Sequence, residues 1–276
     1  MNYVYFQVGN LPSYLKFSID SVLKNDPDSK IYLITDKEFK YKNVITLNTQ
    51  RLESSQIKEL KKINYFSNWD TNPLWESSLL RVFYLHEAAR SQNINKFIHF
   101  DSDVVLFEPF EKIESLFEEK LNITPLSKDF LVFGYSYIGN IDLYEEVCKL
   151  IFNVYKQSDF YENKYYRGKK LIEMKALYIV CKENPEYFNL LPVHPEDSSL
   201  YVFDPASYGQ YVGGTHNKRF SKGFTDKNHI LGKDLKDKKI KPTLKKNLKV
   251  INFNSKDYKL VNLHVHNKKL KKYFNY

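Results

Sequence analysis

Two aspartates separated by one serine follow a short apolar segment, in Phe97-Ile98-His99-Phe100-Asp101-Ser102-Asp103. Side chains two residues apart on an extended backbone point to the same side, so we expect both carboxylates together at the end of a strand. Hard divalent cations prefer oxygen ligands and are usually held by one or two carboxylates plus substrate phosphates. The pattern therefore predicts a site for Mn²⁺ or Mg²⁺. The alternative is an Asp-Ser-Asp turn that caps nearby backbone amides.

The elements around this pair alternate between strand and helix patterns. Buried-type strands are predicted at 3–8, 31–34, 44–47 and 96–100, and helices at 14–23, 52–63 and 75–90. Later segments predict helices at 113–119, 144–155 and 170–180 and strands at 131–133, 135–137, 200–203 and 259–266. Alternation of this kind predicts an α/β fold with a mostly parallel sheet flanked by helices, in which ligands bind outside the carboxyl ends of the strands.

Composition and length favour one main globular domain. The chain has 276 residues, of which 42% are hydrophobic and 16% aromatic, which is enough to build a packed core. It has two cysteines, neither with zinc-ligand spacing, and its N-terminus lacks a signal-peptide pattern, so we expect a cytoplasmic protein. The Asn122-Ile123-Thr124 glycosylation sequon is therefore expected to be incidental.

Basic residues are concentrated at the C-terminal end. Residues 218–276 contain 18 Lys and Arg against four acids, a net +14, which leaves −5 for residues 1–217. We therefore divide the chain into a catalytic core at 1–217 and a basic segment at 218–276. Such a segment could contact nucleic acid, the phosphates of a small ligand or an anionic membrane surface, or simply form a solvated face.

The helix and strand around the two aspartates resemble a known family. The segments Trp75–Leu85 and Lys96–Phe107 are similar to the helix and DxD signature of GT-A glycosyltransferases, including galactosyl- and glucosyltransferases related to glycogenin. The resemblance implies that Arg81 contacts the diphosphate of a nucleotide-sugar or organises the DxD motif. It also implies that Asp101 touches ribose and metal and that Asp103 ligates the metal. Ser102, between them, is expected to contact the nucleotide-sugar. The alternative for Arg81 is an ordinary helix-surface arginine.

A second similarity lies near the C-terminus, in Val261-Asn262-Leu263-His264-Val265-His266-Asn267-Lys268. Many GT-A enzymes take a third metal ligand from a histidine in this region, which implies this role for His264. His266 lies on the same strand face and is expected to support the site, and Lys268 and Lys269 are expected to neutralise phosphate. The alternative for the two histidines is decoration of an exposed strand.

The donor is expected to contact the first βαβ unit. The resemblance places the nucleotide base at the ends of the first two strands, near Phe6, Gln7, Val8, Gly9 and Asp36. Gly9 and Asp36 could equally be a turn glycine and a strand-end cap. A glycine-rich stretch at 201–216, also familiar from GT-A sequences, offers Gln210, Gly213 and Gly214 for sugar recognition. Its alternative is a structured loop without a catalytic role.

Two acids are candidates for a catalytic carboxylate on the acceptor side. Glu173 lies at an expected helix start and Asp204 lies in the glycine-rich stretch. An inverting transferase needs a general base there, whereas a retaining enzyme needs only a stabilising polar group. The alternative for each is a surface or capping acid.

These observations predict a transferase that moves a sugar from a nucleoside-diphosphate donor, with UDP as the favoured nucleotide, to a glycan or lipid-linked acceptor. One alternative is a sugar-phosphate nucleotidyltransferase, but Val8-Gly9-Asn10-Leu11-Pro12 is not the expected arginine-containing loop. A second is a nucleic-acid-binding protein that uses its lysine-rich end, which would leave the DxD segment unexplained. The sequence contains no phosphate-loop, dinucleotide-binding, serine-hydrolase or zincin motif.

Overall fold

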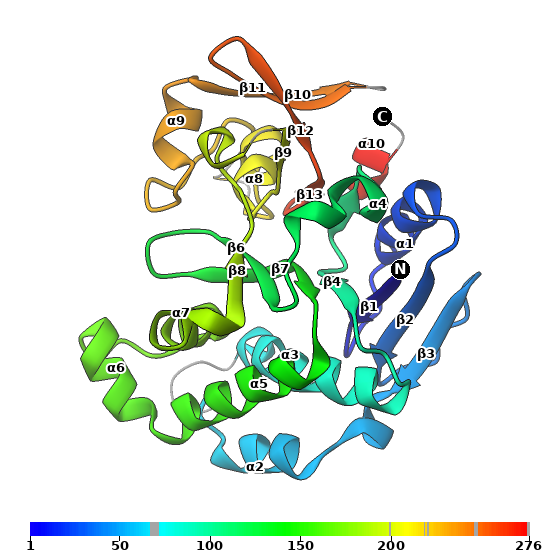
Figure 1. The fold of residues 1–276 in the computed structure, drawn as a ribbon, viewed down its shortest axis with the longest axis vertical. Coiled ribbons are helices and arrows are strands. Elements are labelled where there is room, and N and C mark those ends of the chain that lie inside the picture. The colour runs from blue at the N-terminus through cyan, green and yellow to red at the C-terminus, as the bar shows by residue number, and fades with distance from the viewer. Residues whose placement is uncertain (67–71, 199, 218, 220, 246–247, 275–276) are drawn as a thin grey trace.

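The computed structural model describes residues 1–66, 72–198, 200–217, 219, 221–245 and 248–274. Its centre is a sheet with the strand order β3-β2-β1-β4-β7-β6-β8 (Figure 1). The strands are β1 (Asn2–Phe6), β2 (Lys30–Thr35), β3 (Val44–Asn48), β4 (Phe97–Phe100), β6 (Leu121–Pro125), β7 (Leu131–Ile138) and β8 (Phe188–Leu190). The first four are parallel, and β7 runs antiparallel to both β4 and β6. The predicted α/β class with a mostly parallel sheet is confirmed.

Alternating side chains of the central strands enter two separate cores. Val4 and Phe6 of β1 pack with helices α2 (Ser55–Ile63), α3 (Pro73–Ser91), α5 (Ile141–Lys156) and α7 (Glu173–Glu183). Tyr3 and Tyr5 point to the opposite face, where they pack with α1 (Leu15–Asn25) and α4 (Phe110–Ile113). Each fully buried large apolar side chain stabilises the fold by about 1.5–3 kcal/mol, so neither sheet face can be left uncovered.

Helix α3 carries a predicted site residue, and its start is well specified by sequence. Asn72 accepts a hydrogen bond from the backbone N–H of Leu74, and Pro73 occupies the first helical position. Its buried side chains continue as far as Ala89, so the helix is anchored along its length against the sheet. Arg81 is therefore held on a fixed element.

The C-terminal segment forms a second, mixed sheet above the first (Figure 1). Strands β10 (Ile240–Lys245), β11 (Leu248–Phe253) and β12 (Lys256–Leu260) are joined by β9 (Tyr201–Val202). Strand β13 (Asn262–His264) leaves this sheet and pairs with β5 (Val104–Leu106). The C-terminal part also contains helices α8 (Ser207–Gly213), α9 (Gly232–Lys236) and α10 (Leu270–Phe274), and α6 (Ser158–Tyr166) follows α5 in the chain. The proposed division at residue 217 stays a prediction.

Two predicted elements are wrong in extent. The strand expected at 259–266 is divided at Val261 between β12 and β13, because the chain passes from one sheet to another there. The helix expected at 113–119 is only α4 and a following 3-10 turn (Glu114–Leu116), ahead of β6. Among the described residues, none of the helices combines the length and hydropathy needed to cross a bilayer.

Asn122 of the sequon is a buried structural residue. Its Nδ2 donates to the backbone oxygens of Glu118, Lys120 and Tyr137, and its Oδ1 accepts from the N–H of Glu118. The side chain is fully buried and holds the turn that precedes β6. A glycan on this nitrogen would require the turn to open.

Replacement of Asn122 by alanine should lower the free energy of unfolding by roughly 3 kcal/mol, because several buried polar groups would lose their partner. Urea unfolding measures this change. The matched control is Asn163→Ala on the exposed face of α6, which should change stability by less than about 0.5 kcal/mol. Equal effects of the two substitutions would contradict the prediction.

Candidate active site

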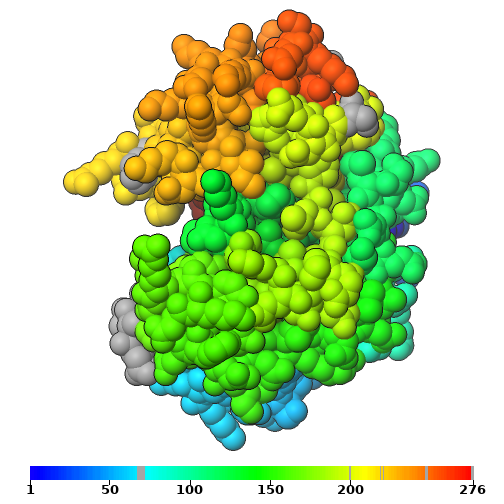
Figure 2. All heavy atoms as spheres, turned by 60° about the vertical axis from the view of Figure 1, so that its left-hand side comes forward, coloured from blue at the N-terminus to red at the C-terminus, as the bar shows by residue number. Residues whose placement is uncertain are grey.

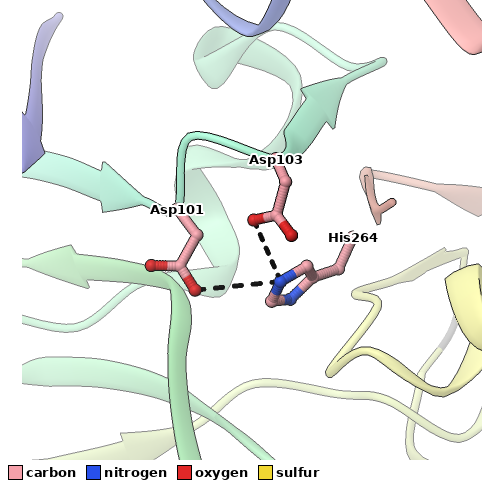
Figure 3. A group of neighbouring side chains, drawn as sticks. All are labelled: Asp101, Asp103 and His264. Atoms are coloured by element: carbon pink, nitrogen blue, oxygen red, sulfur yellow. Dashed lines mark ion pairs between the residues drawn. The ribbon is translucent and has the colours of Figure 1, made fainter. Parts of the chain in front are cut away.

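Asp101 and Asp103 lie in the turn between β4 and β5. The backbone N–H of Val104 donates to the carbonyl of Asp101 at 3.0 Å, so this segment is a turn and not the extended backbone that we expected. Both carboxylates nevertheless face one imidazole: His264 Nε2 is 3.2 Å from Asp103 Oδ1 and 3.8 Å from Asp101 Oδ2 (Figure 3). Within the described residues, these carboxylates contact charged or imidazole side chains and not local backbone amides.

The pairing of β13 with β5 delivers His264 to this turn. His264 lies opposite Val104 in the antiparallel register, and the next residue, Val265, donates its N–H to the carbonyl of Asp103 at 2.8 Å. Gly134 of β7 provides room for the imidazole, since a Cβ at this position would lie 2.9 Å from His264 Nδ1. The close approach explains why residue 134 is a glycine.

The three side chains can hold a divalent cation. Their ligand atoms all lie within 4.8 Å of one another, and carboxylate and imidazole groups are both common ligands of divalent metal ions. Burial acts to raise the pKa of Asp103, but neighbouring His264 and Lys268 outweigh it and hold this pKa well below its usual range. Asp103 is therefore ionised, and the cluster of Asp101, Asp103 and His264 is compatible with a divalent cation.

Arg81 lies between two acids beneath the turn. It forms an ion pair with Asp101, and its second terminal nitrogen donates to Glu173 Oε1 at 2.9 Å. Arg81 is 9% exposed, so its interpretation as an ordinary helix-surface arginine is wrong. Its guanidinium carbon also lies 5.7 Å from the ring centroid of Phe133. This arrangement fixes the orientation of Asp101.

Glu173 is the first residue of α7 and is buried. Burial raises the pKa of its carboxyl to about 7, although the neighbouring Arg81 acts in the opposite direction. A carboxyl group with a pKa near neutrality exchanges its proton at physiological pH, a property found at many catalytic acids.

Asp204, the other candidate catalytic acid, has both oxygens engaged with backbone. Oδ1 accepts from the N–H groups of Ala206 and Tyr208, and Oδ2 accepts from those of Gly209 and His264. The residue is 2% exposed. Asp204 therefore connects α8 with β13, and this environment favours a role in positioning His264 over proton transfer.

The glycine-rich stretch contains α8, which packs directly on β13, the strand that carries His264. A Cβ at Gly209 would lie 1.8 Å from the carbonyl oxygen of His264, so only glycine permits this contact. The Gly213 carbonyl accepts from Asn267 Nδ2, and Gly214 ends the helix with a φ of 76°. Gln210 lies on the same helix. Sugar recognition by Gln210, Gly213 and Gly214 stays a prediction.

The expected base-binding residues lie at the carboxyl ends of β1 and β2. Gly9, with a φ of 74°, donates its N–H to Asp36 Oδ1 at 2.8 Å, which ties the two strand ends together. Phe6 stacks on Tyr84 of α3 at 5.5 Å between centroids and is buried, whereas the adjacent Val8 is half-buried. These contacts place the four residues along one edge of the sheet without testing their predicted role.

Ser102 links this edge of the sheet to the turn that carries Asp101 and Asp103. Its hydroxyl donates to Gln7 Oε1 at 2.9 Å, so the DxD turn is attached to the end of β1. The expected contact of Gln7 with the nucleotide base stays a prediction. The sequence did not reveal the role of Asn262, because a single asparagine in a strand carries no pattern, yet its side-chain oxygen accepts from the N–H of Asp204.

His266 and Lys268 extend the cluster beyond β13. The rings of His264 and His266 stack at 4.5 Å with an interplanar angle of 18°, and burial together with His264 lowers the pKa of His266 to about 3. Lys268 pairs with Asp103 Oδ2, and its ammonium lies 5.7 Å from the Tyr14 ring centroid. The structure thus brings together Arg81, Asp101, Asp103, His264 and Lys268.

Figure 2 shows a hollow between the yellow and orange atoms of the C-terminal part and the green atoms below.

Solved structures that resemble the chain are glycosyltransferases. Mouse xyloside xylosyltransferase 1 is 13% identical over 70% of this chain and 86% of its own, with a TM-score of 0.47. The galactosyltransferase LgtC is 11% identical over 80% and 81%, with a TM-score of 0.44, and the PaToxG glycosyltransferase is 15% identical over 67% and 69%, with a TM-score of 0.42. No protein-family model and no curated relative matches the sequence.

Asp204→Ala should lower the free energy of unfolding by roughly 3 kcal/mol or more, since four backbone N–H groups would lose their acceptor. Urea denaturation measures this loss, with the exposed Asp28→Ala as control. A change within about 0.5 kcal/mol of the control would show that Asp204 does not anchor α8 and β13.

The stability contributed by Glu173 should fall as pH rises. Its folded-state pKa of about 7 lies above the ordinary glutamate value of 4.5, so the folded protein binds more protons than the unfolded chain between these values. The contribution is present below the unfolded pKa and is lost as pH rises through the folded one. We expect the stability of the wild type relative to Glu173→Gln to decrease between pH 5 and pH 7.5 in urea titrations. A constant or increasing difference would refute the raised pKa.

Proposed function

We propose that the protein is a metal-dependent glycosyltransferase that moves a sugar from a nucleoside-diphosphate donor, with UDP as the favoured nucleotide, to a glycan or lipid-linked acceptor. The observation that carries this proposal is the convergence of Asp101, Asp103 and His264, beside two further cationic side chains, at the carboxyl edge of the sheet. Ligands of α/β proteins bind at this edge.

The charges of the site suit a diphosphate. A divalent cation held by the two aspartates and His264 would act as a Lewis acid on the departing diphosphate. Lys268 offers an ammonium on the exposed side of Asp103, where it can contact phosphate oxygens. Arg81 holds Asp101 in place from the buried side, so the carboxylate does not rotate away when a ligand binds.

The roles of the remaining residues follow their positions. We propose that Phe6, Val8, Gly9 and Asp36 border the base and ribose, because they lie at the end of β1 and β2 next to the Gln7–Ser102 hydrogen bond. Glu173 is the candidate polar group beside the transferred sugar, since it shares Arg81 with Asp101. Asp204 is reassigned as a positioning residue for His264. Gln210, Gly213 and Gly214 are proposed to line the sugar side of α8.

The basic C-terminal sheet is proposed as a peripheral contact with anionic membrane. Lys241, Lys245 and Lys256 are exposed on β10 and β12, on the side of the molecule away from α2 (Figure 1). A cytoplasmic enzyme with a lipid-linked acceptor would work at such a surface. The nucleic-acid alternative is disfavoured, because it gives no role to the buried Asp103 and His264.

Asp103→Asn should reduce sugar transfer by more than about a thousandfold, since one ligand of the cation would lose its charge. The measurement is release of nucleoside diphosphate from a panel of UDP-, GDP- and CDP-sugars with and without Mn²⁺, with donors first selected by thermal shift. Asp237→Asn, an exposed acid after α9, is the control and should keep full activity. Undiminished Mn²⁺-dependent transfer by a folded Asp103→Asn protein would overturn the proposed function.

A further inference from the structure

Asp103 is shared between an imidazole and an ammonium group. Its Oδ1 faces His264 Nε2 at 3.2 Å, within the cluster that can hold a divalent cation. Its Oδ2 forms an ion pair with the ammonium of Lys268. The same carboxylate therefore belongs to a cation site and to an ion pair that the chain itself supplies.

Lys268 is the member of this group that can move. Its side chain is 41% exposed, whereas those of Asp103 and His264 are 6% and 8% exposed. The ammonium lies on a flexible four-carbon stem and passes near the ring of Tyr14, which gives it a favourable surface along its path. The backbone of Lys268 has a φ of 60°, a left-handed conformation that turns the chain away from β13.

The charge of the site limits how strongly it can hold a divalent cation while Lys268 remains in place. Three acids, Asp101, Asp103 and Glu173, are opposed by the two basic side chains of Arg81 and Lys268. A divalent cation at Asp103 would meet the ammonium of Lys268 at short range in a partly buried environment, where like charges repel strongly. The oxygen atoms of a diphosphate would remove this repulsion by accepting hydrogen bonds from the ammonium group, which would then leave Asp103.

We propose that Lys268 couples cation binding to diphosphate binding. This inference rests on the proposed function and specifies how its two ligands depend on each other. Without a nucleotide, Lys268 competes with the cation for Asp103. When a nucleoside diphosphate binds, Lys268 moves to the phosphate oxygens and releases Asp103 Oδ2, so that each ligand strengthens the binding of the other, as linkage requires.

The test compares Lys268→Met with wild type in the full chain. Mn²⁺ affinity is measured from the electron paramagnetic resonance signal of unbound Mn²⁺, first alone and then with saturating UDP. Lys268→Met should bind Mn²⁺ alone more tightly, by a factor on the order of 5 or more, because the competing ammonium is gone. The factor by which UDP strengthens Mn²⁺ binding should shrink correspondingly.

Lys271→Met is the matched control, since it removes the same charge from nearby α10, where the side chain is exposed. It should leave both affinities within about twofold of wild type, as expected for a solvent-screened charge. Equal gains in the two variants would attribute the effect to overall charge and would overturn the inference.

The sign of the change separates the remaining explanations. Unchanged Mn²⁺ affinity in Lys268→Met would mean that Lys268 serves phosphate only, and weaker affinity would mean that it supports the carboxylates; either result overturns the inference while the proposed function stands. Failure of the wild type to bind Mn²⁺ with or without UDP would overturn both together.

Discussion

The antiparallel pairing of β13 with β5 is the interaction on which the whole site depends. Only three residues of each strand take part, yet they join a segment near residue 105 to one near residue 263. Without this pairing, the DxD turn would have two carboxylates and no imidazole. The pairing also buries Asp103, and a buried carboxylate requires charged or hydrogen-bonding partners to remain ionised.

Such a short ladder needs support from outside. Asp204 accepts the N–H of His264 and three N–H groups at the start of α8, while Asn262 accepts the N–H of Asp204. Gly209 and Gly134 allow α8 and β7 to approach His264 closely on two sides. The glycine-rich stretch thus has a clear structural role, because it holds a C-terminal strand against the central sheet. This explains why the stretch is rich in small residues even before any contact with sugar is considered.

The parts of the fold that depend on local pattern were predictable. The alternating faces of β1 and β2 and the apolar stripe of α3 are visible in the sequence because burial acts on each element separately. The cluster of Asp101, Asp103 and His264 was predictable from the Asp-Ser-Asp spacing and from the resemblance of the segment around His264 to GT-A enzymes. The turn at Asp101–Asp103 and the capping of α8 by Asp204 were each the stated alternative, because these contacts are local. What could not be predicted is nonlocal: the pairing of β13 with β5, the division of 259–266 between two sheets, and the bond of Asp204 with the N–H of His264. Each joins segments that lie more than 50 residues apart.

Paired charges explain how such a buried, acid-rich cluster remains stable. Arg81 forms ion pairs with both Asp101 and Glu173 on the buried side of the cluster. Lys268 forms an ion pair with Asp103 on the exposed side. The two pairs differ in one respect that matters for function: Arg81 is enclosed and makes several contacts, whereas Lys268 reaches the site from a solvent-exposed loop. A fixed cation preserves geometry, and a movable one can be exchanged for a ligand. Under the proposed function, the chain would compensate these acids when no donor is bound and the ligand would compensate them when it is. Such an exchange would remove the conflict between folding stability and strong cation binding.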